Sequence, residues 1–203
     1  MSSRIYPQLF LLLALWSPWV ISAAENSFAE EKLRDARVEP TLESLAQYAA
    51  QGDLAMVNLL LDAGVSVTKG DPIRRVTPLH NAAAQGHIKI VQRLLDLNVK
   101  VDAPDWHGVT PLVSAAFYGN LEVVRLLLSK GADANVKPSK APSPLVAAVQ
   151  RGKLSVVEAL LNAGANPSKP DVFGQTPLEA ARLAGRTAIL ARLEEKKNLG
   201  TAK

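Results

Sequence analysis

Cysteine is absent from the 203 residues, which excludes disulfide bridges, thiolate catalysis, zinc knuckles and a lipoprotein anchor. A chain without thiols is stable in any redox compartment, so this absence does not indicate a location. Aromatic residues make up only 5%, and the formal net charge is a modest +4. Because the basic residues are dispersed and form no stripe with interleaved aromatics, we expect no nucleic-acid partner.

Sequence signatures of catalysis and of metal binding are also missing. There is no Gly-x-Ser-x-Gly, no Gly-x-x-x-x-Gly-Lys and no His-Glu-x-x-His, and the chain has only three histidines. Apolar residues at 48% and charged residues at 21% are ordinary for a soluble globular protein. We therefore predict a protein that is not an enzyme, with no catalytic residue, no cofactor and no metal ion.

Residues 1–24 have the composition of a secretory signal peptide. Arg4 is their only charged residue, the apolar run Leu9–Leu15 follows, and Ser22 and Ala24 stand at positions −3 and −1 of a cleavage site. Two alternatives are a buried N-terminal helix and an uncleaved anchor, since the uncharged span approaches the ~20 residues that cross a bilayer. Proline and serine residues shorten the apolar part, so we favour cleavage and a periplasmic location without membrane attachment.

A 33-residue repeat organises the rest of the chain. The tripeptide Thr-Pro-Leu or Ser-Pro-Leu recurs at that spacing, beginning at Thr77, Thr110, Ser143 and Thr176. A glycine recurs with it, at Gly86, Gly119, Gly152 and Gly185, and Gly52 lies 34 residues before Gly86. Such self-similarity predicts a stack of like units rather than one closed core.

Each unit is predicted to form two short helices. The hydroxyl before proline caps the first helix, proline fits its first position, and the recurring glycine ends it. The second helix carries apolar residues at spacings of three and four, as in Ile88, Val91, Leu94 and Leu95. We expect it to close in the left-handed conformation at Gly64, Asn98, Gly131 and Gly164.

These units resemble the ankyrin-repeat family, on the evidence of four segments: Thr77–His80 with Gly86–His87, Asp105–Leu112, Asp171–Leu178 and Gly131–Val136. The resemblance implies an all-α ankyrin-repeat solenoid of helix-turn-helix units with β-turn fingers. It covers residues 41–195 in about five units, 41–76, 77–109, 110–142, 143–175 and 176–195. The fingers within residues 70–76 and 137–142 lack the finger glycine, so we expect irregular hairpins there. The resemblance also implies that His80 and His87 tie the helix cap to a neighbouring loop.

The two ends of the array are predicted to be caps. Residues 25–40 are expected to form an N-terminal capping helix, with Ser27–Glu30 as a capping box and with Phe28 and Leu33 covering the first unit. In the last unit Thr187 and Glu194 replace leucines, since no further unit would bury that face. Residues 196–203 are expected to be a polar, frayed tail.

The resemblance places finger tips and first-helix ends along one groove that repeat proteins use to bind partners. The positions carried over are Ile73, Arg74, Gln85, Trp106, His107, Phe117, Tyr118, Ser139, Lys140, Gln150, Arg151, Phe173 and Leu183. Four of the six aromatic residues that follow residue 24 are among them, and aromatic and arginine side chains are frequent anchors of protein interfaces. The alternative is that Phe117 packs under a finger and Trp106 shields its hairpin.

A signal peptide followed by a small ankyrin array is similar to periplasmic ankyrin-repeat proteins of Gram-negative bacteria. That resemblance implies a monomer that binds another protein, as an adaptor or accessory factor for an envelope protein, for instance in stress defence. One alternative is an immunity protein or inhibitor that neutralises a delivered toxin or a secreted enzyme. Another is a membrane-anchored envelope scaffold, if residues 1–24 are retained.

Overall fold

The computed structural model describes residues 18–201, which form eleven α-helices. They are α2 (Pro18–Asp35), α3 (Leu42–Gln51), α4 (Leu54–Asp62), α5 (Pro78–Gln85), α6 (Ile88–Leu95), α7 (Pro111–Tyr118), α8 (Leu121–Ser129), α9 (Pro144–Gln150), α10 (Leu154–Asn162), α11 (Pro177–Leu183) and α12 (Thr187–Thr201). The first 17 residues of the predicted signal peptide lie outside the described residues.

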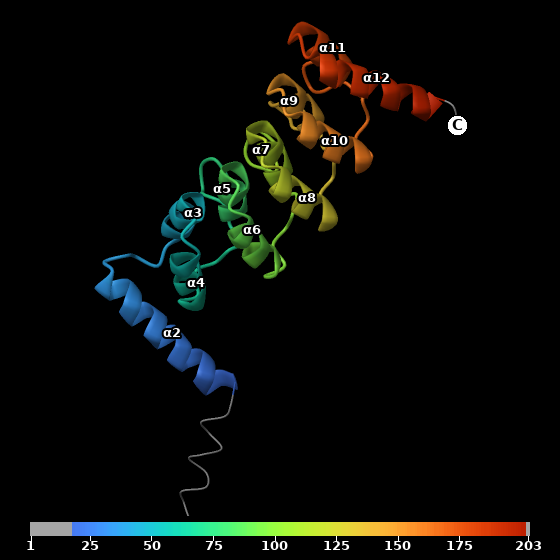
Figure 1. The fold of residues 1–203 in the computed structure, drawn as a ribbon. Helices are drawn as coiled ribbons and strands as arrows, with labels where there is room; N and C mark the ends of the chain where they lie inside the picture. Colours follow the sequence, from blue (N-terminus) through green and yellow to red (C-terminus); the bar gives the residue numbers. More distant parts are fainter. Residues whose placement is uncertain (1–17, 202–203) are drawn as a thin grey trace, which may run out of the picture.

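The helices from α3 onward form two parallel rows (Figure 1). We call α3, α5, α7, α9 and α11 the inner row, and α4, α6, α8, α10 and α12 the outer row. Neighbours within each row pack on one another, and each inner helix packs on the outer helix that follows it in the chain. The predicted all-α solenoid of helix pairs is confirmed.

Helix starts and ends follow the expected local chemistry. The Thr77 hydroxyl accepts the His80 N–H at the start of α5, and the Thr176 hydroxyl accepts the Glu179 N–H at the start of α11. Proline occupies the first turn of both helices. The four predicted ends of the second helices all have positive φ, between +55° and +87°, at Gly64, Asn98, Gly131 and Gly164.

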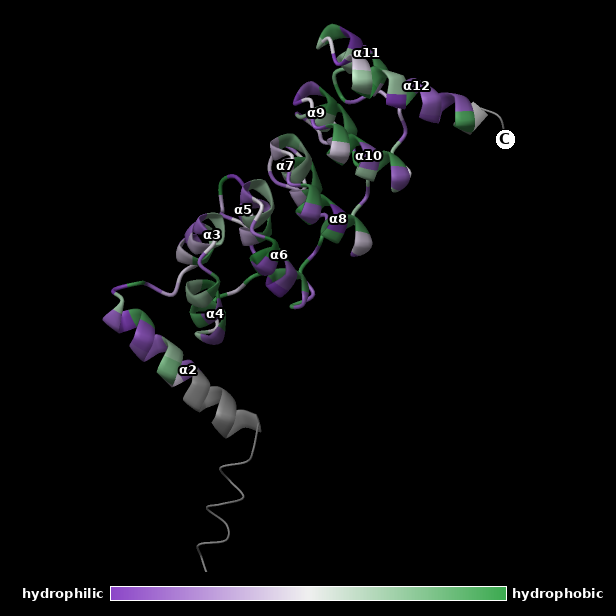
Figure 2. Cartoon of the chain, in the orientation of Figure 1, coloured by the Kyte–Doolittle hydropathy of each residue, from purple (hydrophilic) through white to green (hydrophobic). Residues whose placement is uncertain are grey.

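The core is continuous along the stack because buried apolar side chains recur in every repeat. Buried leucines recur in the inner row, at Leu45, Leu79, Leu112, Leu145 and Leu178, and the outer row adds Val57, Val91, Val124, Val157 and Ile189. Buried alanines on α5 and α7 let neighbouring helices approach closely. In Figure 2 the coloured part of α2 and the C-terminal part of α12 are more hydrophilic than most of the helices between them.

The N-terminal cap differs from its prediction. Helix α2 continues through Ser27, so no capping box opens there; alanine and glutamate residues around Ser27 favour helix over a break. α2 packs on α4 through Ala29 and Leu33, which are both about 1% exposed, whereas Phe28 is 59% exposed. Phe28 therefore does not cover the first unit as expected.

The C-terminal cap is longer than predicted. Residues 196–201 continue α12, so this part of the expected frayed tail is helical. Arg182 holds the same repeat position as the buried Ala116, two 33-residue periods earlier. Its guanidinium pairs with the Glu194 carboxylate at 3.1 Å across the free end of the stack. The two polar residues allow that end to face water where inner units bury apolar side chains.

Candidate partner-binding surface

The finger before α7 is shaped by an aspartate at its base. The Asp105 carboxylate accepts the N–H groups of His107 and Val109, both at 2.8 Å, and the Asp105 N–H donates to the Val109 carbonyl at 2.9 Å. Gly108 has φ +80°, and a Cβ there would lie 2.7 Å from the Ser139 backbone nitrogen. Glycine is therefore required by both conformation and packing, and the resulting tip presents Trp106.

The first three fingers are joined to one another by hydrogen bonds. The Trp106 N–H donates to the Arg74 carbonyl at 2.9 Å, and the Lys140 N–H donates to the His107 carbonyl at 3.0 Å. The Ser139 hydroxyl donates to the same His107 carbonyl at 2.8 Å. The first three tips are therefore joined in a row. We call the four tips, residues 72–75, 106–108, 139–141 and 172–174, the fingertips.

The first finger is one residue longer than its neighbour but is not irregular. Asp71 pairs with Val76 as Asp105 pairs with Val109, and the Asp71 carboxylate accepts the N–H groups of Ile73, Arg74 and Val76. Arg75 stands where the finger glycine would be and adopts its left-handed conformation, with φ +58°. The expected irregularity is therefore wrong for this finger, because Asp71 organises the turn without glycine.

The finger within residues 137–142 lacks such an organiser, because Pro138 occupies the aspartate position. Its Lys140 N–H and Ser139 hydroxyl bond to His107 of the preceding finger instead. In the last finger Asp171 again accepts two N–H groups, those of Phe173 and Gln175.

The inner helix ends lie beside the fingertips and comprise residues 84–85, 117–118, 150–151 and 183–184. Tyr118 is 53% exposed, and its ring meets the half-buried Phe117 ring edge to face at 5.1 Å. The Arg151 guanidinium lies over the Phe117 ring, 4.5 Å from its centroid, in a cation–π contact that links two repeats. Phe117 thus packs under an arginine of the next repeat.

The remaining predicted site residues all reach the surface. Trp106 is 53% exposed, and its ring contacts the half-buried His107 ring at a centroid distance of 4.1 Å, tilted by 54°. Ile73 and Phe173, in the first and last fingers, are 80% and 68% exposed. Arg74, Gln85, Ser139, Lys140, Gln150, Arg151 and Leu183 are exposed as well. Gln150 reaches the last finger, where its amide donates to the Gln175 side chain at 2.8 Å.

Two hollows lie between the fingers and the inner row. One separates the first finger from α3 and is lined by Leu42, Ala46, Ile73, Arg74 and Asn81 among others. The other lies between the last finger and α11, lined by Phe173, Gln175 and Leu183 among others. The exposed apolar tips at both ends of the row therefore border recesses in which a partner's side chains could be held.

Comparison with known families confirms the relationship that the motifs indicate. The pattern described as ankyrin repeats in three copies matches residues 45–138, and the single ankyrin repeat matches residues 143–172. The chain belongs to the ankyrin-repeat family. The last ankyrin unit, α11 with α12, lies beyond the matched residues but has the same packing. A comparison with curated proteins finds no match to the chain.

Ankyrin repeats are protein–protein interaction modules, so the family assigns this chain a binding role at a coarse level. Within residues 18–201 no three histidine, aspartate or glutamate side chains gather as a metal site would require. Across the same residues, every helix is too short or too polar to cross a bilayer.

His80 ties its helix cap to the neighbouring finger, as expected, whereas the His87 ring makes no cap bond and joins its unit to helix α3 of the preceding one. His80 is 4% exposed, and its ring contacts the Thr77 hydroxyl at 2.8 Å and the Val109 carbonyl at 3.0 Å. His87 contacts the Ala50 carbonyl at 2.9 Å. With their rings engaged between repeats, these two histidines are structural rather than part of the surface.

Some features of the surface were missed by the sequence interpretation. Arg75 is exposed beside Arg74, and Val172 is 38% exposed beside Phe173. Both positions follow from the period of 33 residues, because Arg75 aligns with Gly108 and Val172 aligns with Ser139.

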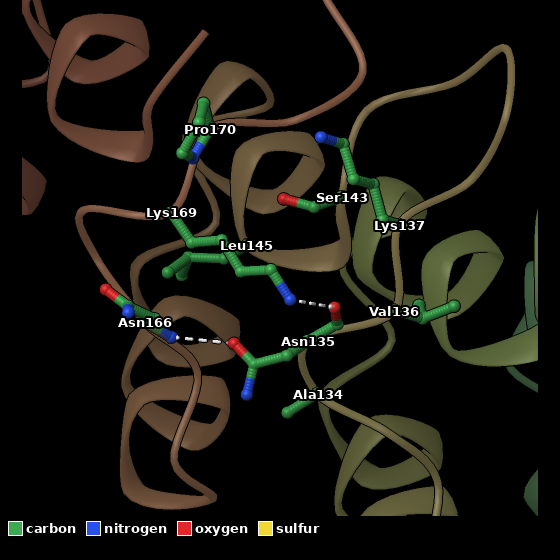
Figure 3. A pocket seen from close by; sticks show the side chains of 9 residues that line it. All are labelled: Ala134, Asn135, Val136, Lys137, Ser143, Leu145, Asn166, Lys169 and Pro170. Carbon is green, nitrogen blue, oxygen red and sulfur yellow. Dashed lines mark hydrogen bonds between the residues drawn. The ribbon is translucent and has the colours of Figure 1, made fainter. Parts of the chain in front are cut away.

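A small crevice lies away from the fingertips, where two inter-repeat linkers meet (Figure 3). Asn135 accepts the Asn166 N–H at 3.0 Å through its side chain, and its backbone carbonyl accepts the Lys169 ammonium at 3.1 Å. The Asn135 amide also donates to the Gly164 carbonyl at 2.9 Å. Its polar groups are used to join repeats, so the crevice is part of the framework of the stack.

Proposed function

We propose that this protein acts in the periplasm as an ankyrin-repeat adaptor or accessory factor that holds an envelope protein on its fingertips and inner helix ends. The observation that carries the proposal is the row of exposed side chains, Ile73, Trp106, Tyr118 and Phe173, on a closed core. Exposed large apolar residues gathered on one face are typical of binding surfaces.

The backbone under the middle of this face is held by hydrogen bonds within the protein itself. Trp106 is fixed through its own N–H to Arg74, and the next finger is fixed to His107. Tyr118 stands at the end of a helix whose proline start and glycine end are both in place. A preordered surface loses little conformational entropy on binding, which supports affinity for a protein partner.

The test is a pull-down from periplasmic extract with tagged protein produced from the full-length gene. We expect the wild-type protein to capture a partner and the double variant Trp106→Ala, Tyr118→Ala to lose it. The matched control is Ile88→Ala, Leu154→Ala, which removes two partly exposed apolar side chains at the starts of outer helices. Equal capture by all three proteins would contradict the assigned surface.

Export is tested separately. Mass spectrometry of the protein recovered from the periplasm should give a chain that begins at Glu25. Full-length protein retained in the membrane fraction would instead favour the anchored scaffold.

A further inference from the structure

The structure points to an acidic partner segment: we infer that the fingertips and inner helix ends bind a protein segment in which an apolar side chain is flanked by carboxylates. The inference rests on the proposed function, because it describes the chemistry of what the same face would hold. It follows from the distribution of charge on the face and from the order of the fingers.

All charged residues at the fingertips and inner helix ends are basic. Arg74 and Arg75 lie in the first finger, Lys140 lies in the third, and Arg151 lies at the end of α9. No aspartate or glutamate occurs at any of these positions. Cations concentrated on one face attract a partner of opposite charge and penalise a basic one.

Four carboxylates close to this face are occupied by the protein itself; a fifth, the exposed Glu43 of α3, lines the hollow beside Ile73 and Arg74 and is not held in this way. Asp71, Asp105 and Asp171 each accept backbone N–H groups within their own fingers. Glu179 accepts the N–H and the hydroxyl of Thr176, and these two bonds hold its pKa below the ordinary value. The Arg74 N–H is the main cause of a lowered pKa at Asp71, which keeps that carboxylate ionised and directed at the finger.

The basic side chains of the face form no salt bridge within the described part of the chain, although Arg74 is attracted to the Asp71 carboxylate of its own finger. Within residues 18–201, the salt bridges involve Arg125, Lys130, Arg182 and Arg192 and none of the four basic fingertip and inner-helix-end residues. Arg151 contacts only the flat face of Phe117 in its cation–π pair, so the N–H edges of its guanidinium can still donate to a carboxylate. Four cations are thus available to a partner.

The order of the fingers adds a spatial pattern. Trp106 is hydrogen-bonded through its backbone to Arg74 on one side, and its neighbour His107 is bonded to Lys140 on the other. The central aromatic tip therefore stands between two basic tips. A segment with an aromatic or aliphatic residue between acidic residues would place its apolar side chain on Trp106 and a carboxylate toward each neighbouring finger.

The experiment selects ligands from a displayed library of random peptides, using protein produced from the full-length gene. The enriched peptides should carry aspartate or glutamate on both sides of an apolar residue. A selected peptide, labelled with fluorescein, is then titrated by fluorescence anisotropy. Raising the salt concentration from about 0.05 to 0.5 M should weaken binding of the wild-type protein at least severalfold.

Two charge-matched double variants locate the effect. Arg74→Glu, Lys140→Glu should weaken binding by about tenfold or more. Lys89→Glu, Arg125→Glu reverses the same number of charges on exposed outer-row residues and should leave affinity unchanged. Circular dichroism should confirm that both variants are folded. The salt titration tests the contribution of charge to binding without any variant.

The outcomes separate this inference from the proposed function. The inference of an acidic segment would be overturned if the selection enriched neutral or basic peptides. It would also be overturned if binding changed neither with salt nor with the Arg74→Glu, Lys140→Glu variant. If such peptides still required Trp106 and Tyr118, the proposed binding face would remain. If binding survived Trp106→Ala, Tyr118→Ala as well, both proposals would be overturned.

Discussion

His80 links the cap of α5 to the next finger through both nitrogens of its ring. Nε2 faces the Val109 carbonyl and must carry the proton, so Nδ1 is the acceptor for the Thr77 N–H at 3.2 Å and the Thr77 hydroxyl at 2.8 Å. Burial is the main cause that lowers the pKa of His80 below its ordinary 6.5, against opposing effects of the Val109 carbonyl and Asp105. The folded protein therefore requires a neutral His80.

This requirement predicts a loss of stability in mild acid. As pH falls, the unfolded chain binds a proton at His80 at a higher pH than the folded protein does. The contribution of neutral His80 to the free energy of unfolding is therefore complete above pH 6.5 and is lost as pH falls through the lowered pKa of the folded state. Urea unfolding should show that the free energy of unfolding decreases between about pH 7 and pH 5, by at most about 2 kcal/mol. In His80→Val, which keeps the other two histidines, this decrease should largely disappear; an equal decrease in both proteins would assign the effect elsewhere.

Thr110 shows what happens where that histidine is missing. Its hydroxyl is buried and has no hydrogen-bond partner, because Val113 occupies the position that His80 holds relative to Thr77. A buried unpaired hydroxyl costs about 1–3 kcal/mol.

Val113→His should recover part of that cost. At pH 8 we expect the free energy of unfolding to rise by about 1 kcal/mol, because the new ring can pair with Thr110 and with the Pro142 carbonyl of the next finger. Val146→His is the matched control: Ser143 already accepts the Val146 N–H, so the gain should be smaller. A decrease in chemical-denaturation stability for Val113→His alone would show that the pocket around His80 is not reproduced one repeat later.

The fingers depend on specific backbone conformations as well as on the aspartates at their bases. Gly108 and Gly174 have nearly the same φ, +80° and +79°, but only Gly108 faces the backbone of the following finger. Alanine at either position incurs the left-handed penalty of about 1 kcal/mol. At Gly108 the added Cβ must also displace Ser139.

We therefore predict that Gly108→Ala destabilises the protein by at least about 1 kcal/mol more than Gly174→Ala, measured by urea unfolding. Gly108→Ala should also weaken partner binding, since it disturbs the row that positions Trp106. Equal losses for the two variants would mean that contact between fingers contributes little to the stack.

The helix pairs could be predicted closely, because proline, glycine and apolar spacing act over a few residues. Finger geometry was harder: Arg75 adopts a glycine conformation that only the three N–H bonds to Asp71 explain. The start predicted at Ser27 failed for a related reason, since a local capping pattern does not decide whether a helix has already begun upstream.

The whole molecule is a stack in which each repeat binds the next and the ends are finished with polar residues. The period of 33 residues predicts this arrangement and also the positions that reach the fingertips. Exposure of Trp106 and Tyr118 could be predicted only through the family resemblance, because an aromatic residue in a finger can equally pack inward. The Arg151–Phe117 contact could not be predicted, since it depends on side-chain placement between repeats.

The central claim is that partners bind along the fingertips and inner helix ends and not along the outer row. Site-specific photo-crosslinking tests it most directly, with a photoreactive phenylalanine introduced in turn at Trp106, Tyr118 and Phe173, and at Ile88 and Leu154 on outer helices. The account predicts crosslinks to the partner from the first three positions and none from the last two. Crosslinks from Ile88 or Leu154, with none from Trp106 or Tyr118, would contradict it.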